Sequence, residues 1–312
     1  MYLRYFFRAV MAAAIAGAAY LLFSTLKAYT VEEITTAMRA IPATHLAAGL
    51  GFAACSYLCL ACSDWLGVRY AGKALTFSKT ALASFTSLSI GHNVGVAALS
   101  SGAVRYRFYS RWGLTAEDVA KIIVFCGTTV GLGLATLGAM GLYFRPGDAV
   151  KLSGLSPQAI FVLAFACLLF PILYLLLAAF LRAPLHIRHW RFQMPRLHLA
   201  AAQVLVGTAN FAFVAASLHQ MLSVFADADY LKVAAVSITA NIAAIISHVP
   251  GGLGVLEATV THVLPGADTI AAVIAFRVVY YFIPLAIGLP ILVGSEIWLK
   301  SGDVSMPKEN IS

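Results

Sequence analysis

"SLSIGHNVGVAALSSGAVRYRFYSRWGL", residues 87–114, joins a glycine-interrupted apolar segment directly to a basic cluster. Gly91 and Gly95 weaken any helix that runs through the apolar part, because glycine loses more conformational freedom on folding than other residues. Three arginines follow: Arg105, Arg107 and Arg111. Such residues favour the cytoplasmic side of a membrane. The stretch therefore poses the question of whether its apolar part crosses a membrane or enters it and returns.

The composition of the whole chain defines its class. Of 312 residues, 61% are hydrophobic and 11% are charged, and the mean hydropathy is +0.87. These values lie far outside the range of soluble domains. We predict an all-α polytopic membrane protein, a single integral membrane domain over residues 1–312 with about eight hydrophobic segments. The net charge of +8 indicates orientation and attraction to anionic lipid, and no nucleic-acid partner is expected.

Apolar runs separated by turn signals give the expected helices. They are residues 9–26, 45–65, 79–100, 118–144, 157–181, 199–223, 230–248, 253–264 and 268–299. The first run has a basic start and is also compatible with a cleaved signal peptide, but we expect a retained helix. Thr115 and Asp118 form the pattern of a capping box, which predicts a helix start.

The distribution of basic residues argues against treating every segment as a crossing. If Arg4 and Arg8 are cytoplasmic, simple crossings put the basic loop at 181–196 and the arginines at 105–111 outside, against the positive-inside rule. A re-entrant segment at 79–100 corrects both errors and places both termini in the cytoplasm. It also marks a functional centre, because non-helical backbone in a membrane needs a protein or water lining. An ordinary helix loosened by small residues is the alternative.

A second passage, "HVPGGLGVLEATVTHVLPGADTIAAVIAFRVVYY" at 248–281, is similar to the first. Residues 250–255 align with 91–96, and the pentapeptide ending at Phe276 aligns with the one ending at Phe125. Three crossings between the two passages would invert the second hairpin, which is the inverted-repeat plan of many transporters. We therefore expect six crossings plus two re-entrant hairpins. The expected re-entrant turns are Gly91, Gly95, Pro250, Gly251, Gly252 and Gly254. Chance similarity of glycine-rich stretches is the alternative.

Candidate substrate-binding residues lie around these turns. Arg105 and Arg107 can hold a lipid phosphate through forked, charge-assisted hydrogen bonds, and Tyr106 suits the headgroup boundary. The alternative is that the arginines only anchor the topology.

Charged residues inside the bilayer are the other candidates, since each costs at least about 2.5 kcal/mol unless it is paired or hydrated. Glu257 and Arg277 are expected to form a salt bridge that lines a headgroup path, with a purely structural pair as the alternative. His92 and Asn93 can hydrogen-bond a headgroup or satisfy broken backbone.

The sequence gives only weak signals for disulfides, metal sites or enzymatic activity. The five cysteines fall inside apolar segments, where packing explains them better than a disulfide framework or a metal site. The sequence has no phosphate-binding glycine loop, no hydrolase triad and no zinc spacing, so we expect no enzyme, no catalytic residue, no metal and no cofactor. "DAD" at 227–229 is similar to the paired aspartates of glycosyltransferases, which keeps such an enzyme as an alternative.

The passages "IGHNVGVAALSSGAVRYRFYSRWGL", "SHVPGGLGVLE" and "AFRVVYY" closely resemble the membrane domain of the lysylphosphatidylglycerol synthetases, also called multiple peptide resistance factors, over about residues 79–299. The resemblance implies a stand-alone form of their flippase domain without the soluble synthase domain. It further implies a multi-pass protein of the bacterial cytoplasmic membrane that moves a phospholipid, such as aminoacylated phosphatidylglycerol, between leaflets.

A membrane phospholipid is then the substrate and a separate lipid-synthesising protein the expected partner, while the oligomeric state stays open. The alternatives are a membrane-embedded lipid-modifying or glycosyl-transfer enzyme, or a non-transporting partner subunit of one.

Overall fold

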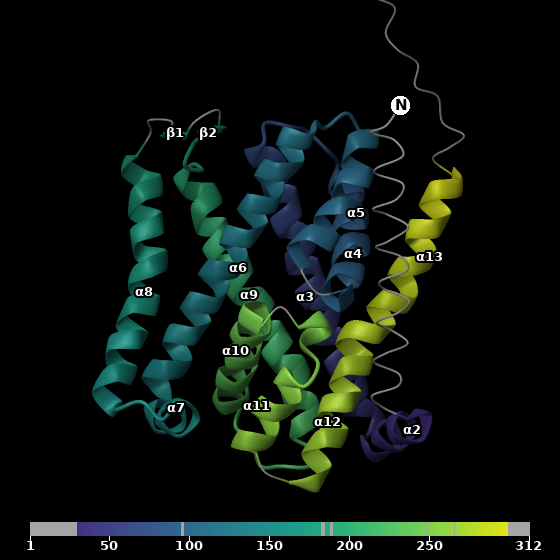
Figure 1. Ribbon diagram of the computed structural model, residues 1–312, viewed down its shortest axis with the longest axis vertical. Helices are drawn as coiled ribbons and strands as arrows, with labels where there is room; N and C mark the ends of the chain where they lie inside the picture. The colour runs from purple at the N-terminus through teal and green to yellow at the C-terminus, as the bar shows by residue number, and fades with distance from the viewer. Residues whose placement is uncertain are drawn as a thin grey trace, which may run out of the picture.

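The computed structural model describes residues 30–94, 97–181, 185–187, 190–247, 249–264 and 266–298, which form a helical bundle (Figure 1). Its α-helices are α2 (Val31–Ala40), α3 (Ala43–Tyr70), α4 (Phe77–Val94), α5 (Ala97–Arg111), α6 (Ala116–Phe144), α7 (Pro146–Ser153), α8 (Pro157–Phe180), α9 (Leu197–Leu222), α10 (Tyr230–Ser247), α11 (Val255–Val263), α12 (Ala267–Arg277) and α13 (Ile283–Trp298). The predicted first helix at 9–26 lies outside the described residues.

Three short elements complete the described chain. A 3₁₀ turn, η1 (Pro250–Gly252), lies between α10 and α11, and a π-helical segment, η2 (Val278–Phe282), joins α12 to α13. An antiparallel hairpin of β1 (Leu185–Ile187) and β2 (Trp190–Phe192) forms in the basic loop after α8. The predicted capping box at Thr115 and Asp118 is confirmed at the start of α6.

Six described helical stretches are long and apolar enough to cross a membrane. They are Ala43–Tyr70, Ala116–Phe144, Pro157–Phe180, Leu197–Leu222, Tyr230–Ser247 and Thr269–Ser295. The prediction of a polytopic helical membrane protein is therefore confirmed. The set includes α10, which the sequence pattern assigns to a hairpin. With 18 residues, α10 is about 27 Å long, close to the thickness of the hydrocarbon core.

The predicted segment at 79–100 consists of two helices. α4 has 18 residues and α5 has 15, and they pack along each other. α4 is not among the apolar spans, because its polar residues lower its hydropathy. Five of its hydroxyl side chains are fully buried: Thr80, Ser84, Thr86, Ser87 and Ser89. The junction, with Gly95, lies outside the described residues. α5 continues to Arg111, so the arginine cluster lies on the returning helix and not, as expected, in a loop after it.

The two helical hairpins occupy opposite halves of the bundle (Figure 1). α4 and α5 lie in the upper half of the view beside α13, whereas α10, α11 and α12 lie in the lower half. α3 and α9 pack on each other, α6 packs on both, and α8 packs against α6 at one edge. The β-hairpin lies at the upper end and α2 and α7 lie at the lower end.

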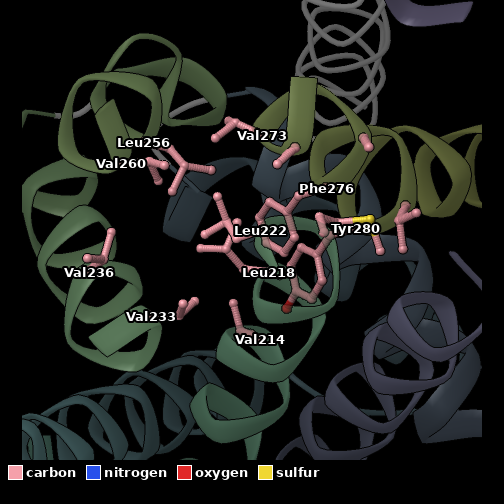
Figure 2. Packing of buried hydrophobic residues seen from close by; sticks show 14 of the residues in the cluster. Val214, Leu218, Leu222, Val233, Val236, Leu256, Val260, Val273, Phe276 and Tyr280 are labelled. Atoms are coloured by element: carbon pink, nitrogen blue, oxygen red, sulfur yellow. The ribbon is translucent and has the colours of Figure 1, made fainter. Parts of the chain in front are cut away.

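A hydrophobic core holds the lower half together. Figure 2 shows Leu218 and Leu222 of α9 close to Leu256 of α11 and Phe276 of α12, all buried. Inside a membrane such contacts stabilise the bundle through van der Waals packing, because lipid tails are as apolar as these side chains. Tyr280 of η2 belongs to the same cluster. The core therefore fixes α11 against the helix that carries Arg277.

Glycine permits the closest helix contact in the bundle's centre. A Cβ added to Gly133 of α6 would lie 2.3 Å from the backbone of Gly207 on α9, and one added to Gly207 would lie 2.3 Å from the carbonyl oxygen of Thr129. No side chain fits at either position, so α6 and α9 touch backbone to backbone. Small residues serve this purpose in membrane helix packing.

Candidate functional site

The first hairpin contains a buried ion pair. Arg105 on α5 is 4% exposed, and its Nε and Nη2 donate to the two carboxylate oxygens of Asp64 on α3, at 2.8 and 2.9 Å. Its Nη1 donates to Ser101 Oγ at 3.0 Å. This bidentate arrangement is the strongest that arginine makes with a carboxylate. It ties the returning helix of the hairpin to α3.

The carboxylate of Asp64 has further donors on the same hairpin. Ser84 Oγ on α4 donates to Oδ2 at 2.6 Å, and the phenol of Tyr109 on α5 donates to Oδ1 at 3.3 Å. The side chain of Asp64 is 1% exposed. A buried charge is tolerated when its lone pairs are satisfied in this way. Asp64 therefore joins α3, α4 and α5 in one closed polar network.

The candidate phosphate-binding residues of α5 do not share one environment. The forked face of Arg105 is engaged by Asp64. Arg107 and Tyr106 are half-buried on the same helix, and each has its own interactions. Sequence reasoning missed Asp64, although a carboxylate inside the apolar segment at 45–65 was a usable signal of a buried partner.

The second hairpin is broken at "PGGLG", residues 250–254. Gly251, Gly252 and Gly254 have φ angles of +61°, +58° and +79°, in the left-handed region that glycine adopts without steric cost. Arg277 on α12 satisfies two carbonyl groups of this break: its Nη1 donates to Gly251 O at 2.8 Å and its Nη2 to Gly252 O at 2.9 Å. The guanidinium thus holds the non-helical backbone in place.

The same guanidinium binds Glu257 in the first turn of α11. Nε donates to Oε1 at 2.5 Å and Nη2 to Oε2 at 2.9 Å, which confirms the predicted salt bridge. The side chain of Arg277 is 2% exposed and that of Glu257 is 17% exposed. The pair is therefore buried on the arginine side and partly exposed on the carboxylate side.

The end of α4 meets the break of the second hairpin next to this pair. α4 packs against η1, and a Cβ placed on Gly251 would lie 4.0 Å from Asn93 O and 4.0 Å from Arg277 Nη1. The amide of Asn93 donates to Ser89 O at 2.8 Å and to Tyr281 O at 3.5 Å. The side chain of Asn93 therefore binds backbone carbonyls, one of the two roles considered for it.

His92 lies in an aromatic cluster at the end of α4. Its ring centroid is 6.0 Å from that of Tyr57, 6.3 Å from that of Tyr280 and 6.4 Å from that of Tyr281. Its Nδ1 is buried and has no hydrogen-bond partner among the described residues. The ring of Tyr281 also lies 5.7 Å from the guanidinium carbon of Arg277, so it stands between the two candidate residues.

The π-helical segment η2 carries these tyrosines and exposes backbone acceptors to the site. Pro284 has no N–H group for Tyr280 O, four residues earlier. The phenol of Tyr57 donates to that oxygen at 3.4 Å instead. Since Asn93 contacts Tyr281 O, η2 is tied to both α3 and α4. Single π turns inside α-helices often occur at functional sites.

The remaining sequence candidates do not gather into a reactive site. Asp229 of "DAD" pairs with Arg145 at the surface, and all five cysteines are free. Across the described ranges, no group of three or more His, Cys, Asp and Glu residues could hold a metal ion.

The structure is that of a polytopic helical membrane protein in which an arginine–carboxylate pair ties each of two helical hairpins to a neighbouring helix. The chain is 31% identical over 268 residues to the uncharacterized protein slr0712 of Synechocystis sp. (strain ATCC 27184 / PCC 6803 / Kazusa), covering 84% of this chain and 83% of the relative. It is also 31% identical over 268 residues to the inner membrane protein YbhN of Escherichia coli (strain K12), covering 83% and 82%.

The chain belongs to the family of these two proteins, and it is a multi-pass inner membrane protein. No protein-family model matches it. The resemblance to lysylphosphatidylglycerol synthetases stays a prediction.

Proposed function

We propose that the protein is a lipid flippase-like transporter, without an enzymatic step, that moves a phospholipid between the leaflets of the bacterial inner membrane. One observation carries this proposal: the ends of two broken helical hairpins meet beside a buried arginine–glutamate pair. Asn93 marks the end of the first hairpin's inward helix, and Gly251 marks the break of the second.

The arrangement of the hairpins supports an inverted repeat. α4 and α5 come from one end of the bundle, and α10 and α11 come from the other (Figure 1). We infer that both are re-entrant, with turns at 91–95 and 250–254, and that both termini are cytoplasmic. Many secondary transporters bind substrate near mid-membrane, where discontinuous helices of two inverted repeats meet. Broken backbone at that depth must line protein or water.

The site residues suit a lipid headgroup. Arg277 presents the planar fork that matches a phosphate, and Glu257 is the part of its ion pair that is reachable from outside. His92 Nδ1 supplies a further polar atom at the junction. Arg107 and Tyr106 on the returning helix α5 would contact the headgroup nearer its cytoplasmic entrance. Acyl chains would stay in the surrounding lipid during this movement.

The resemblance to the membrane domain of lysylphosphatidylglycerol synthetases supports the same class of substrate. Aminoacylated phosphatidylglycerol is one candidate, and a separate lipid-synthesising protein would then supply it. The apolar faces of the helices suit the acyl chains of any phospholipid, so headgroup chemistry at the junction must provide the selectivity.

Reconstitution tests the proposal. Purified protein is placed in vesicles of phosphatidylethanolamine and phosphatidylglycerol with a trace of fluorescent phosphatidylglycerol, and dithionite then bleaches the outer leaflet. We expect bleaching to reach the inner-leaflet probe only when protein is present. Arg277→Gln should slow this exchange by about tenfold or more, because it removes a charge-assisted interaction worth about 1.5–3 kcal/mol.

Arg145→Gln is the matched control, since Arg145 also pairs with a carboxylate but has a side chain that is 43% exposed. It should exchange lipid at the wild-type rate. Bleaching confined to the outer leaflet with well-folded wild-type protein would contradict the proposal. Chemical conversion of the probe, detected by mass spectrometry, would support the enzyme alternative.

A further inference from the structure

The two buried ion pairs differ in how far the carboxylate side chain is exposed. The side chain of Asp64 is 1% exposed and accepts hydrogen bonds from Arg105, Ser84 and Tyr109. The side chain of Glu257 is 17% exposed. A carboxylate with an exposed edge can exchange a proton or leave its partner, whereas a fully buried carboxylate that accepts several hydrogen bonds is held in its charged form.

Arg277 keeps other hydrogen-bond acceptors when its carboxylate partner is lost. Besides Glu257, it donates to Gly251 O and Gly252 O at 2.8 and 2.9 Å. These carbonyl dipoles remain when the carboxylate becomes neutral, so the buried guanidinium keeps part of its solvation. Removing one partner of a buried pair normally strands the other charge at a large cost. At this position the break in the chain reduces that cost.

We propose that Glu257 is a proton-binding site, and that a proton on Glu257 and an anionic phosphate headgroup on Arg277 bind together. This rests on the proposed function and names its coupling ion and substrate class. A proton from water forms an O–H bond with the carboxylate of Glu257. The hydrogen bonds from Arg277 to that carboxylate break, and the same N–H groups then bind two oxygens of a phosphate monoanion.

Charge balance favours this exchange. Glu257 and Arg277 together are neutral in the empty site, and protonated Glu257, Arg277 and one phosphate monoanion are again neutral. A net charge at membrane depth is therefore avoided in both states. A phosphate that arrived without the proton would add a negative charge beside the carboxylate. One proton thus accompanies each monoanionic headgroup through the site.

Charged and titratable groups near Glu257 come from several elements. Arg277 comes from α12, and His92 of α4 lies beyond the ring of Tyr281, which contacts both residues. On α11 itself, His262 follows more than one turn later and is exposed.

α11 also packs against α10 and α7, and its Leu256 shares the hydrophobic core with Leu218 and Leu222 of α9. Tyr230 and Lys232 of α10 lie at the end of that helix remote from the break. The side chains of Asp148 and Lys151 of α7, and all of His248, lie outside the described part of the chain.

Proton uptake on ligand binding is the direct test. Short-chain phosphatidylglycerol is added to purified wild-type protein in detergent with little buffer at neutral pH, and a pH-indicator dye reports protons taken up. We expect uptake approaching one proton per protein at saturation, and none with zwitterionic phosphatidylcholine. The dissociation constant for phosphatidylglycerol should fall by up to about tenfold for each unit decrease in pH above the pKa of Glu257.

Glu257→Gln mimics the protonated carboxyl, so it should bind phosphatidylglycerol at all pH values with the affinity of the wild type at low pH, and take up no proton. Glu117→Gln is the matched control, because Glu117 pairs with Lys121 on an exposed surface; it should behave as the wild type. The wild-type comparison of the two lipids does not depend on the folding of this variant, and an absence of proton uptake with phosphatidylglycerol would by itself overturn the proposal.

The outcomes separate this inference from the proposed function. Lipid exchange in vesicles together with pH-independent binding and no proton uptake would overturn proton coupling and leave the flippase standing. Proton-linked binding of phosphatidylglycerol without leaflet exchange would keep the site and reject transport. Uptake that persists in Glu257→Gln would assign the proton to another group and overturn the proposal.

Discussion

The α4–α5 and α10–α11 hairpins both depend on an arginine–carboxylate pair, but the pairs are built differently. In the first hairpin, Asp64 from α3 collects donors from α4 and α5, and the network is closed to solvent. In the second, Arg277 from α12 binds the carbonyl groups of the broken backbone as well as the reachable carboxylate of Glu257. The first pair therefore fixes a hairpin to its scaffold, whereas the second both supports the break and carries a partly exposed charge.

The largest loss of stability should come from removing the charge of Asp64 from its closed network. Asp64→Asn leaves Arg105 as a buried charge without its carboxylate, which costs about 3–5 kcal/mol of stability. The free energy of unfolding, measured by titration with denaturing detergent in mixed micelles, checks this value. Asp229→Asn is the control: its partner Arg145 is 43% exposed, so the loss should stay below about 1 kcal/mol. Equal losses in the two variants would contradict a closed network at Asp64.

Removing the carboxylate of the Glu257–Arg277 pair should lower the free energy of unfolding less. Glu257→Gln is expected to cost about 1–3 kcal/mol, because Arg277 keeps its two carbonyl acceptors. Arg277→Gln should cost more, since it also leaves those carbonyl groups of the break without a donor. A double-mutant cycle on the same unfolding measurement should give a coupling energy of about 0.5–3 kcal/mol. Additive losses would show that the two side chains do not interact.

The break itself can be tested through one glycine. Gly251 has a φ of +61°, and an added Cβ would meet no atom closer than 3.9 Å. Gly251→Ala therefore isolates the conformational cost, about 1–2 kcal/mol of stability. Gly51→Ala, at a helical position with nothing within 4 Å of the added Cβ, should be neutral or stabilising. A neutral Gly251→Ala would argue against the left-handed turn.

The smallest effect concerns the contact between α3 and the π-helical segment. Tyr57→Phe removes the hydrogen bond to Tyr280 O, 3.4 Å long, and should cost about 1 kcal/mol or less. Tyr143→Phe, at a side chain that is 63% exposed, should leave the unfolding free energy unchanged. A loss of several kcal/mol from Tyr57→Phe would mean that η2 depends on this contact far more than its length indicates.

The sequence revealed the second site better than the first. The glycines at 251–254 and the pairing of Glu257 with Arg277 could be predicted, because left-handed turns need glycine and isolated charges in a membrane need a partner. Asp64 could have been recognised by the same charge argument. Its partner Arg105, 41 positions later, could not, since the basic cluster fits a membrane-edge anchor equally well. The π-helical segment gave no periodic signal, and only Pro284 indicated that Tyr280 O would need another donor.

Cysteine labelling can determine whether the two hairpins enter the membrane from opposite sides. With the five native cysteines replaced by alanine, single cysteines are placed at Ala116, in the first turn of α6 after the first hairpin, and at His262, in the last turn of α11; both residues are exposed. We predict that an impermeant thiol reagent added to intact cells labels the His262→Cys protein alone, and that the Ala116→Cys protein reacts only after the membrane is opened. Labelling of both positions from the same side would contradict two oppositely oriented hairpins.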